Sequence, residues 1–359
     1  MSKWVKTLAC VGSLIGPSLY GWSNYNLSSN ASVSTEMVQN FPLNNDQQWF
    51  VTESYLIWKP YLEDIDYANH LSSQGNSSSN LAVKMKLEKP DFDWYSGARL
   101  GIGRYLANHD GWDISLFSTY FYCEETDHSN PNVDKGTFLT PTFLLNFSPM
   151  QKGSVLWRMN YFTWDLSIGR EYSLLDSITA HPYLGLRGAL IYQKYKTVSS
   201  DLIAMSTASI AQLGTFKAND TYWGIGPRAG ADLHFYFKKN WSFLGGLSAT
   251  LLYGHYDVKE IAGTVFTLST SVGSGTFDIL FNEKDARYCV RANVEGFFGL
   301  GWEAWVRNHT VRIAPSLLFE GSKWFGVNKF LNATALTTTG RHRGHLSLMG
   351  FSLNLQVDF

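Results

Sequence analysis

Eleven ionisable residues occupy equivalent positions in the alternating pattern of the chain. Each lies on the polar parity of a segment whose other parity is apolar: Arg99, Asp165, Glu171, Arg187, Arg228, Asp232, His234, Arg291, Glu295, Arg312 and Glu320. On the lipid face of a membrane barrel an Arg costs about 2–4 kcal/mol, so we expect these side chains to face a lumen. There they would either line a pore and set its ion preference or form a salt-bridged core without a pathway. The mixture of charge signs predicts weak selectivity.

The spacing of the residues gives little indication of a metal site or of a catalytic site. A zinc site needs closely spaced His or Cys ligands, whereas the nine His are scattered. The densest group, Arg341 to His345, is interpreted as a solvated basic patch, with contact to lipopolysaccharide as the alternative. No Gly-x-Ser-x-Gly nucleophile motif occurs. We therefore expect no enzyme activity, no cofactor and no metal.

Period-two alternation is the dominant pattern from Trp49 onward, and it indicates strands with two chemically different faces. Between residues 288 and 306 the apolar parity includes Val290, Phe298 and Val306, while Arg291 and Glu295 lie on the other parity. The last segment alternates in the same way and ends on an aromatic residue. Its apolar parity consists of Phe351, Leu353, Leu355, Val357 and Phe359.

Alternation alone fits both a soluble sandwich and a membrane barrel. The alternating segments are longer than the 3–10 residues usual for globular strands, and aromatic residues such as Trp94, Trp223 and Trp302 lie near their ends. These features favour an antiparallel transmembrane β-barrel of about ten strands. The strands are predicted at 49–60, 92–104, 112–124, 157–171, 181–197, 220–237, 241–258, 287–306, 310–321 and 345–359.

The predicted connections alternate between short turns and long loops, which is typical of outer-membrane barrels with both chain ends on the periplasmic side. The short turns contain residues 108–111, 173–180, 238–240 and 307–309, and the long loops are 61–91, 125–156, 198–219, 259–286 and 322–344. Residues 81–88 and 137–147 are additional strand candidates. The expected count therefore ranges from 8 to 12.

The beginning of the chain differs from the rest. Residues 1–23 combine Lys3 and Lys6 with an acid-free apolar stretch, which predicts a signal peptide. Residues 24–48 are rich in Asn and Ser and are expected to be a flexible or lumen-inserted segment before the barrel of residues 49–359. Cys123 and Cys289 then remain as the thiols of the exported protein, and the sequence leaves their pairing open.

The composition argues against two other classes, nucleic-acid-binding proteins and helical membrane proteins. The formal net charge is -1 and charged residues make up 16% of the chain, so binding of nucleic acid through bulk charge is not expected. Polar residues interrupt the apolar stretches after the N-terminus, so we expect no transmembrane helix.

Short motifs along the chain resemble one known family. They are Trp58-Lys59-Pro60-Tyr61 with Asp66-Tyr67-Ala68, Asp93-Trp94 with Gly97-Ala98-Arg99-Leu100-Gly101-Ile102-Gly103, His109-Asp110-Gly111-Trp112-Asp113, Pro182-Tyr183-Leu184-Gly185-Leu186-Arg187-Gly188, Tyr222-Trp223-Gly224-Ile225-Gly226-Pro227-Arg228-Ala229-Gly230 and Leu252-Tyr253-Gly254. In this order they are similar to the Legionella-type major outer membrane protein family, which has relatives in environmental chlamydiae. The resemblance implies a pore-forming outer-membrane barrel. It also implies that Phe359 and its strand act as an assembly signal for the barrel-insertion machinery.

The expected function is porin-like passive diffusion of small hydrophilic solutes and ions through an integral barrel of the bacterial outer membrane. The alternative is a non-conducting structural or adhesin-type barrel that displays its long loops. The expected partners are outer-membrane lipid and lipopolysaccharide, the barrel-assembly machinery and small solutes, with homo-oligomerisation left open.

Overall fold

The computed structural model describes residues 49–74, 82–106, 111–131, 137–142, 150–204, 208–238, 240–270, 273–306, 310–335, 338–341 and 343–359. Within these ranges no helix is long and apolar enough to cross a membrane. The expected signal peptide and the segment 24–48 lie outside the described residues.

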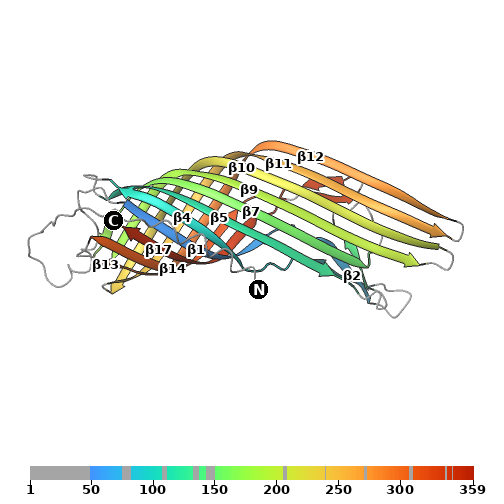
Figure 1. The fold of residues 1–359 in the computed structure, drawn as a ribbon, viewed down its shortest axis with the longest axis horizontal. Helices are drawn as coiled ribbons and strands as arrows, with labels where there is room; N and C mark the ends of the chain where they lie inside the picture. Colours follow the sequence, from blue (N-terminus) through green and yellow to red (C-terminus); the bar gives the residue numbers. More distant parts are fainter. Residues whose placement is uncertain are drawn as a thin grey trace, which may run out of the picture.

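Ten passes of the chain form one closed antiparallel wall (Figure 1), which confirms the expected fold class and strand number. The passes are β1 (Trp49–Leu62), β4 (Tyr95–Tyr105), β5 (Trp112–Ser129), β7 (Lys152–Arg170), β9 (Ile178–Ala204), β10 (Ala208–Lys238), β11 (Trp241–Thr270), β12 (Ser274–Trp302) continued by β13 (Ala304–Val306), β14 (Val311–Trp324) and β17 (Leu346–Asp358). Pairing of β9 with β10 and of β1 with β17 completes the ring.

The first and last strands are joined up to the final residue. Trp49 N donates to Phe359 O and Phe359 N donates to Trp49 O, each at 2.9 Å. We call the rim that holds these two residues the proximal rim, and the opposite end of the barrel the distal rim. A closed wall of this kind satisfies the backbone groups of its spans without water, as a bilayer requires.

The prediction from sequence is wrong for two of the long loops. Residues 198–219 and 259–286 belong mostly to strands, because β9 pairs with β10 as far as Ala204↔Ser209 and β11 pairs with β12 as far as Ser269↔Ser274. The register runs from Ala208↔Thr270 down to Lys238↔Trp241 between β10 and β11. The strands continue through a polar composition because beyond the bilayer neither sheet face has to be apolar.

The other predicted long connections contain strands outside the wall. The candidates at 81–88 and 137–147 are strands in part, β3 (Ala82–Glu88) and β6 (Thr137–Pro141), and with β2 (Ala68–Gln74) they form a separate sheet in the order β3-β2-β6. A second small hairpin joins β15 (Leu331–Ala335) to β16 (Thr338–Arg341). The turn predicted at 173–180 is shorter, since β8 (Tyr172–Leu175) pairs with the start of β9.

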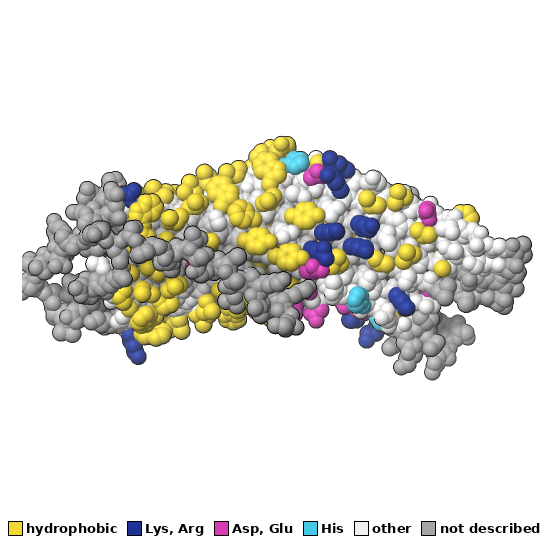
Figure 2. Space-filling model, viewed as in Figure 1, with side chains coloured by type: hydrophobic (Ala, Val, Ile, Leu, Met, Phe, Trp, Pro, Cys, Tyr) yellow, Lys and Arg dark blue, Asp and Glu magenta, His cyan; other side chains and the backbone are white. Residues whose placement is uncertain are grey.

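Apolar side chains cover the outer surface of the proximal half of the barrel (Figure 2). Exposed aromatic residues border this band on both sides. The proximal border includes Trp49, Phe235, Trp241, Trp302 and Phe359, and the distal border includes Tyr120, Tyr122, Phe162, Trp223, Tyr253 and Tyr288. Such paired aromatic girdles mark the two interfaces of a membrane-spanning barrel. Glu53 is an exception to the apolar rule, because it is exposed on this band between Val51 and Tyr55.

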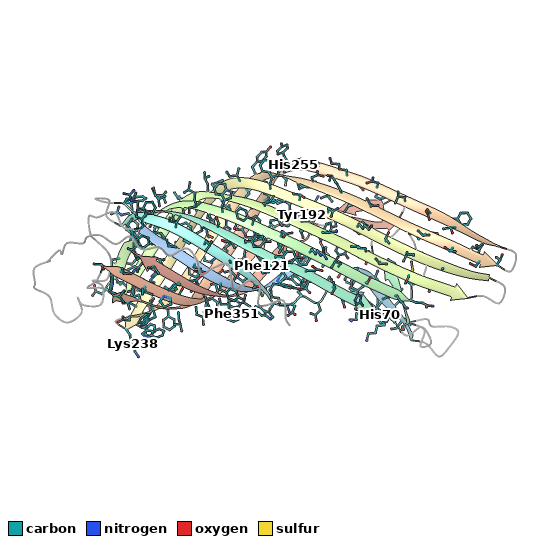
Figure 3. The ribbon with its side chains drawn as sticks, in the orientation of Figure 1. His70, Phe121, Tyr192, Lys238, His255 and Phe351 are labelled. Atoms are coloured by element: carbon teal, nitrogen blue, oxygen red, sulfur yellow. The ribbon has the colours of Figure 1, made fainter. Side chains whose placement is uncertain are left out.

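The lumen of the distal half holds the hydrophobic core. Trp58, Phe121, Trp157, Tyr161 and Trp324 are all at most 4% exposed and belong to one apolar cluster, which we call the aromatic layer. Figure 3 places Phe121 near the middle of the barrel length. Cys123 also belongs to this cluster, Cys289 packs against it, and both thiols are free.

Candidate functional site in the barrel lumen

Ten of the eleven predicted lumenal residues line one cavity of about 310 Å³ inside the proximal half of the barrel. They are Arg99, Asp165, Glu171, Arg187, Arg228, Asp232, His234, Glu295, Arg312 and Glu320. Their strands bring them inward because the neighbouring positions, such as Leu100 and Leu166, are exposed on the apolar band. The structure thus places these charges as the alternation predicts.

Arg187 of β9 connects two other strands of the wall through its guanidinium. Its side chain is 3% exposed and donates two hydrogen bonds of 2.6 Å to the carboxylate of Asp165 on neighbouring β7. Its other face reaches across to β12, where it donates to Asn293 Oδ1 at 2.6 Å and pairs with Glu295 at 2.5 Å. The bidentate geometry suits a guanidinium and would not be reproduced by a Lys.

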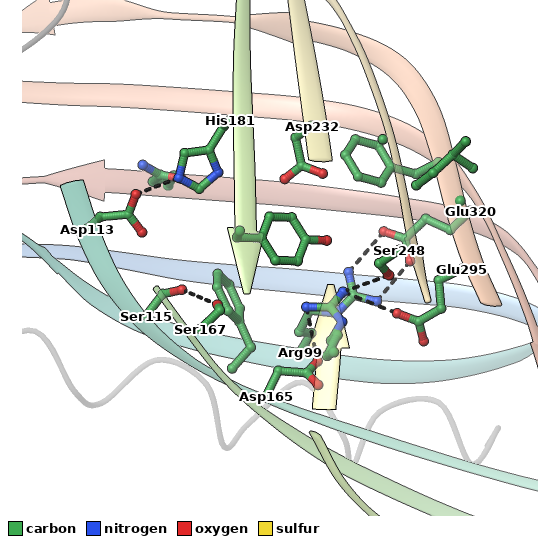
Figure 4. A pocket seen from close by; sticks show the side chains of 18 of the residues that line it. Arg99, Asp113, Ser115, Asp165, Ser167, His181, Asp232, Ser248, Glu295 and Glu320 are labelled. Atoms are coloured by element: carbon green, nitrogen blue, oxygen red, sulfur yellow. Dashed lines mark hydrogen bonds and ion pairs between the residues drawn. The ribbon is translucent and has the colours of Figure 1, made fainter. Parts of the chain in front are cut away.

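Two further Arg side chains extend this network (Figure 4). Arg99 of β4 forms a bidentate pair with Glu320 of β14 at 2.9 and 3.0 Å, and Arg228 of β10 lies 3.4 Å from Glu295. Ser352 and Ser322 donate hydrogen bonds to these two glutamates. We call Arg99, Asp165, Arg187, Arg228, Glu295 and Glu320 the central layer. Its three cations balance its three anions.

A second ion-pair group lies nearer the proximal rim. Arg312 of β14 pairs with Asp358 at 2.5 Å and with Glu303 at 3.1 Å, and it donates to the Tyr105 hydroxyl at 3.3 Å. His181 and Asp113 form a separate contact of 2.5 Å across β9 and β5. We call these residues together the proximal layer.

Arg291 does not lie in the cavity with the other predicted residues. Its guanidinium lies over the rings of Tyr222 and Tyr256, at 4.5 and 5.6 Å from their centroids, and donates to the carbonyl of Gly326. It therefore shares the inward parity of Glu295 but sits at the level of the apolar cluster. Its contacts are cation–π and backbone contacts rather than ion pairs.

Sequence reasoning missed part of the proximal layer. Asp113, His181, Glu303 and Asp358 were not selected as candidates, although all four make the ion pairs described above. The signal was present for three of them. Asp113 alternates with Ile114, His181 shares the parity of Arg187, and Asp358 lies between the apolar residues Val357 and Phe359. The alternation could not predict the inward orientation of Glu303, because this residue lies at the interruption between β12 and β13.

Small residues make room for the rings that narrow the lumen. A Cβ added at Gly103 would collide with the ring of Phe50, and one at Gly101 would collide with the ring of Phe117. These glycines therefore provide the space that the two rings occupy inside the barrel. Among the described residues no group of His, Cys, Asp or Glu is arranged to hold a metal ion.

The aromatic layer borders the charged cavity on the distal side, where Trp58 is one of the lining residues. Trp58 packs against Phe121 and Tyr161 with ring centroids 5.6 and 6.4 Å apart, and Tyr161 packs against Trp324 at 5.9 Å. Arg99 lies 5.7 Å from the Trp58 ring and links this layer to the central layer. From the proximal rim outward the lumen thus contains the proximal layer, the central layer and the aromatic layer.

Comparison with known proteins gives one family and several distant structures. The model of the family described as Legionella pneumophila major outer membrane protein precursor matches residues 40–359. No curated protein matches the chain. Among solved structures, the outer membrane protease OmpT from Escherichia coli is 7% identical with a TM-score of 0.33, over 87% of this chain and 96% of that one.

Two further solved structures are similarly distant. A TodX monoaromatic hydrocarbon channel mutant is 9% identical with a TM-score of 0.27, over 91% of this chain and 92% of that one. A FadL homologue from Pseudomonas aeruginosa is 8% identical with a TM-score of 0.22, over 87% of this chain and 90% of that one.

Proposed function

The chain belongs to the Legionella pneumophila major outer membrane protein family and is an integral outer-membrane β-barrel, and from this premise we propose that it is a narrow channel for the passive diffusion of small hydrophilic solutes and ions. The observation that carries the proposal is the cavity of about 310 Å³ lined by ionisable side chains within the apolar band. Charge buried at this depth is costly unless it is paired or hydrated.

The proposed pathway runs along the layers of the lumen and involves no catalysis. The central layer forms a constriction, because Arg99–Glu320 and Arg187–Glu295 join strands that are not neighbours in the wall. An ion or small polar solute would pass by replacing these contacts one at a time. Since the layer carries three cations and three anions, we expect little preference for either sign of ion.

A specific observation favours a second candidate, a non-conducting barrel that displays its distal strands. Tyr161 and Trp324 meet across the lumen, and the surrounding side chains are almost fully buried. Barrels of about eight strands are just filled by their side chains, and a ten-stranded barrel is only slightly wider. In this case the charged layers act as a structural core.

Conductance in a planar bilayer separates the two candidates. The protein is folded in detergent, its closure is verified by a heat-dependent shift on a gel, and single-channel current is recorded. For a channel we expect small discrete steps and a reversal potential near zero in a salt gradient. Silence from a demonstrably folded sample would reject the channel proposal.

A variant pair makes the test sharper. We expect Trp324→Ala to increase the step size, because it removes a ring that bridges the lumen. The matched control is Trp223→Ala, which removes an exposed ring from the outer surface and should leave the steps unchanged. Equal currents in both variants would show that the lumen at Trp324 is not part of the pathway.

A further inference from the structure

Four cations cluster on the outer surface of the barrel just beyond the distal aromatic girdle. Arg158 of β7, Lys194 and Lys196 of β9 and Lys217 of β10 alternate with buried residues and therefore point outward. We call these four residues the distal basic patch. Figure 2 shows Lys and Arg side chains gathered directly beside the apolar band.

The strand register sets like charges directly opposite one another. Arg158 is paired with Lys194 between β7 and β9, and Lys196 is paired with Lys217 between β9 and β10. Directly opposite side chains in an antiparallel sheet have Cβ atoms about 4.5–5.5 Å apart, and like charges at this distance destabilise the pair. The arrangement is unfavourable unless a nearby anion shares the two charges.

In the described part of the chain, carboxylates compensate one of the four cations. Arg158 donates to Glu124 of β5 at 2.9 Å. Among the described residues, no carboxylate lies within 4.0 Å of the amino groups of Lys194, Lys196 and Lys217. Three positive charges on two neighbouring strands are therefore left to an external partner.

The neighbouring strands show the opposite arrangement and serve as an internal comparison. Lys259 of β11 and Lys284 of β12 are also directly opposite each other, but both lie close to Asp257, at 3.7 and 3.8 Å. Arg287 pairs with Asp285 at 2.8 Å. On β11 and β12 the chain thus supplies an acid beside the two opposed lysines, whereas among the described residues no carboxylate lies within ion-pair distance of Lys196 or Lys217.

The position of the patch identifies the chemistry of its partner. Tyr192, labelled in Figure 3, precedes Lys194 by two residues on the same face, and its hydroxyl donates to Asn219 at 3.3 Å. Leu190 and Trp223 are exposed directly below on the apolar band and are paired with each other. An amphiphile lying on this face would meet apolar side chains with its acyl chains and cations with its headgroup.

We propose that the distal basic patch binds the phosphate groups of a phosphorylated glycolipid of the outer leaflet, of the lipid A type. The acyl chains lie along the surface that includes Leu190 and Trp223, and the phosphates lie between the opposed cations. This site is on the outside of the barrel, so it holds whether or not the lumen conducts.

Native mass spectrometry of the detergent-folded full chain tests the proposal with diphosphoryl lipid A as the probe. For the variant Lys194→Gln/Lys196→Gln/Lys217→Gln we expect the affinity for lipid A to fall roughly 100-fold. The matched control neutralises the exposed lysines Lys84, Lys86 and Lys152 and should bind as the parent protein does. A heat-shift gel verifies that each variant is folded.

Further arms distinguish the source of the phosphate. Inorganic phosphate at millimolar concentration should not compete, and lipid A without phosphates should bind the parent protein and the triple variant equally weakly. Competition by inorganic phosphate would show a free-anion site and overturn the lipid assignment. Equal loss of lipid A binding in the triple variant and in the control would show that only the net charge of the protein matters. This result would also overturn the proposal.

Discussion

Tyr161 on β7 and Trp324 on β14 lie with their ring centroids 5.9 Å apart in an edge-on arrangement, although their strands are five positions apart in a ring of ten. They are therefore anchored on opposite sides of the barrel. Two rings are long enough to bridge the lumen of a barrel this narrow. Both side chains are at most 1% exposed, so the contact forms part of the hydrophobic core inside the barrel.

The first prediction concerns the stability that this contact provides. Trp324→Ala should lower the free energy of unfolding by about 3–5 kcal/mol, as for other large-to-small changes in a core. The measurement is urea-induced unfolding of the protein in lipid vesicles. Trp223→Ala on the outer surface is the comparison, and an equal loss in both variants would show that the lumenal contact carries no special weight.

The second prediction concerns the buried ion pairs. Arg187→Leu leaves Asp165 and Glu295 without their main partner, so we expect a loss of about 3–5 kcal/mol in unfolding free energy. Arg287→Leu breaks an exposed pair with Asp285 and should cost less than about 1 kcal/mol. Adding Glu295→Gln to the Arg187 variant should recover part of the loss, and no recovery would contradict the assigned pairing.

The third prediction separates two roles of the last residue. Phe359→Ala keeps the backbone hydrogen bonds to Trp49 and removes only the exposed ring, whereas deletion of Phe359 removes both. If the ring is the assembly signal, both variants should insert poorly into the outer membrane of cells. Normal insertion of Phe359→Ala together with poor insertion of the deletion would assign the effect to strand closure instead.

The fourth prediction concerns the carboxylate on the lipid face. Glu53 lies directly opposite Leu100 of β4 and Leu355 of β17. Its carboxylate therefore faces lipid, and the directly opposite residues on both neighbouring strands are apolar. Glu53→Leu should therefore raise the free energy of unfolding in vesicles by about 1 kcal/mol. Asp278→Leu, at an exposed position of the distal strand extension, should give no such gain. A loss of stability in the Glu53 variant would show that this acid has a partner in the membrane.

The fifth prediction concerns pH and lies beyond the membrane span. Burial alone raises the pKa of Glu63, but hydrogen bonds from Lys323 and from the His345 backbone outweigh it, so the pKa lies below its ordinary value of 4.5. The stabilisation is therefore complete above that ordinary value and is lost as the pH falls through the lowered pKa. Proteolysis of the distal segments should increase at acid pH in the parent protein, and Glu63→Gln should show this susceptibility already at neutral pH. Unchanged cleavage of Glu63→Gln at neutral pH would contradict the assignment.

The sequence by itself determined which side chains face lipid and which face the lumen. A strand has a period of two, so one apolar parity fixes the orientation of every neighbour, and Arg187, Glu295 and Glu320 followed from it. The strand number and the family could also be predicted, because long alternating segments recur in a fixed order along the chain.

Only the tertiary structure decided the level of each inward residue and its partner. Arg291 and Glu295 share a parity, yet one lies over Tyr222 and the other in the central layer, because strand tilt and stagger set the height in a closed barrel. The contact between Tyr161 and Trp324 depends on the same closure, which joins residues far apart in sequence. The extended hairpins of β9 to β12 were also decided there, since strands beyond the bilayer need no apolar face and leave no clear pattern in the sequence.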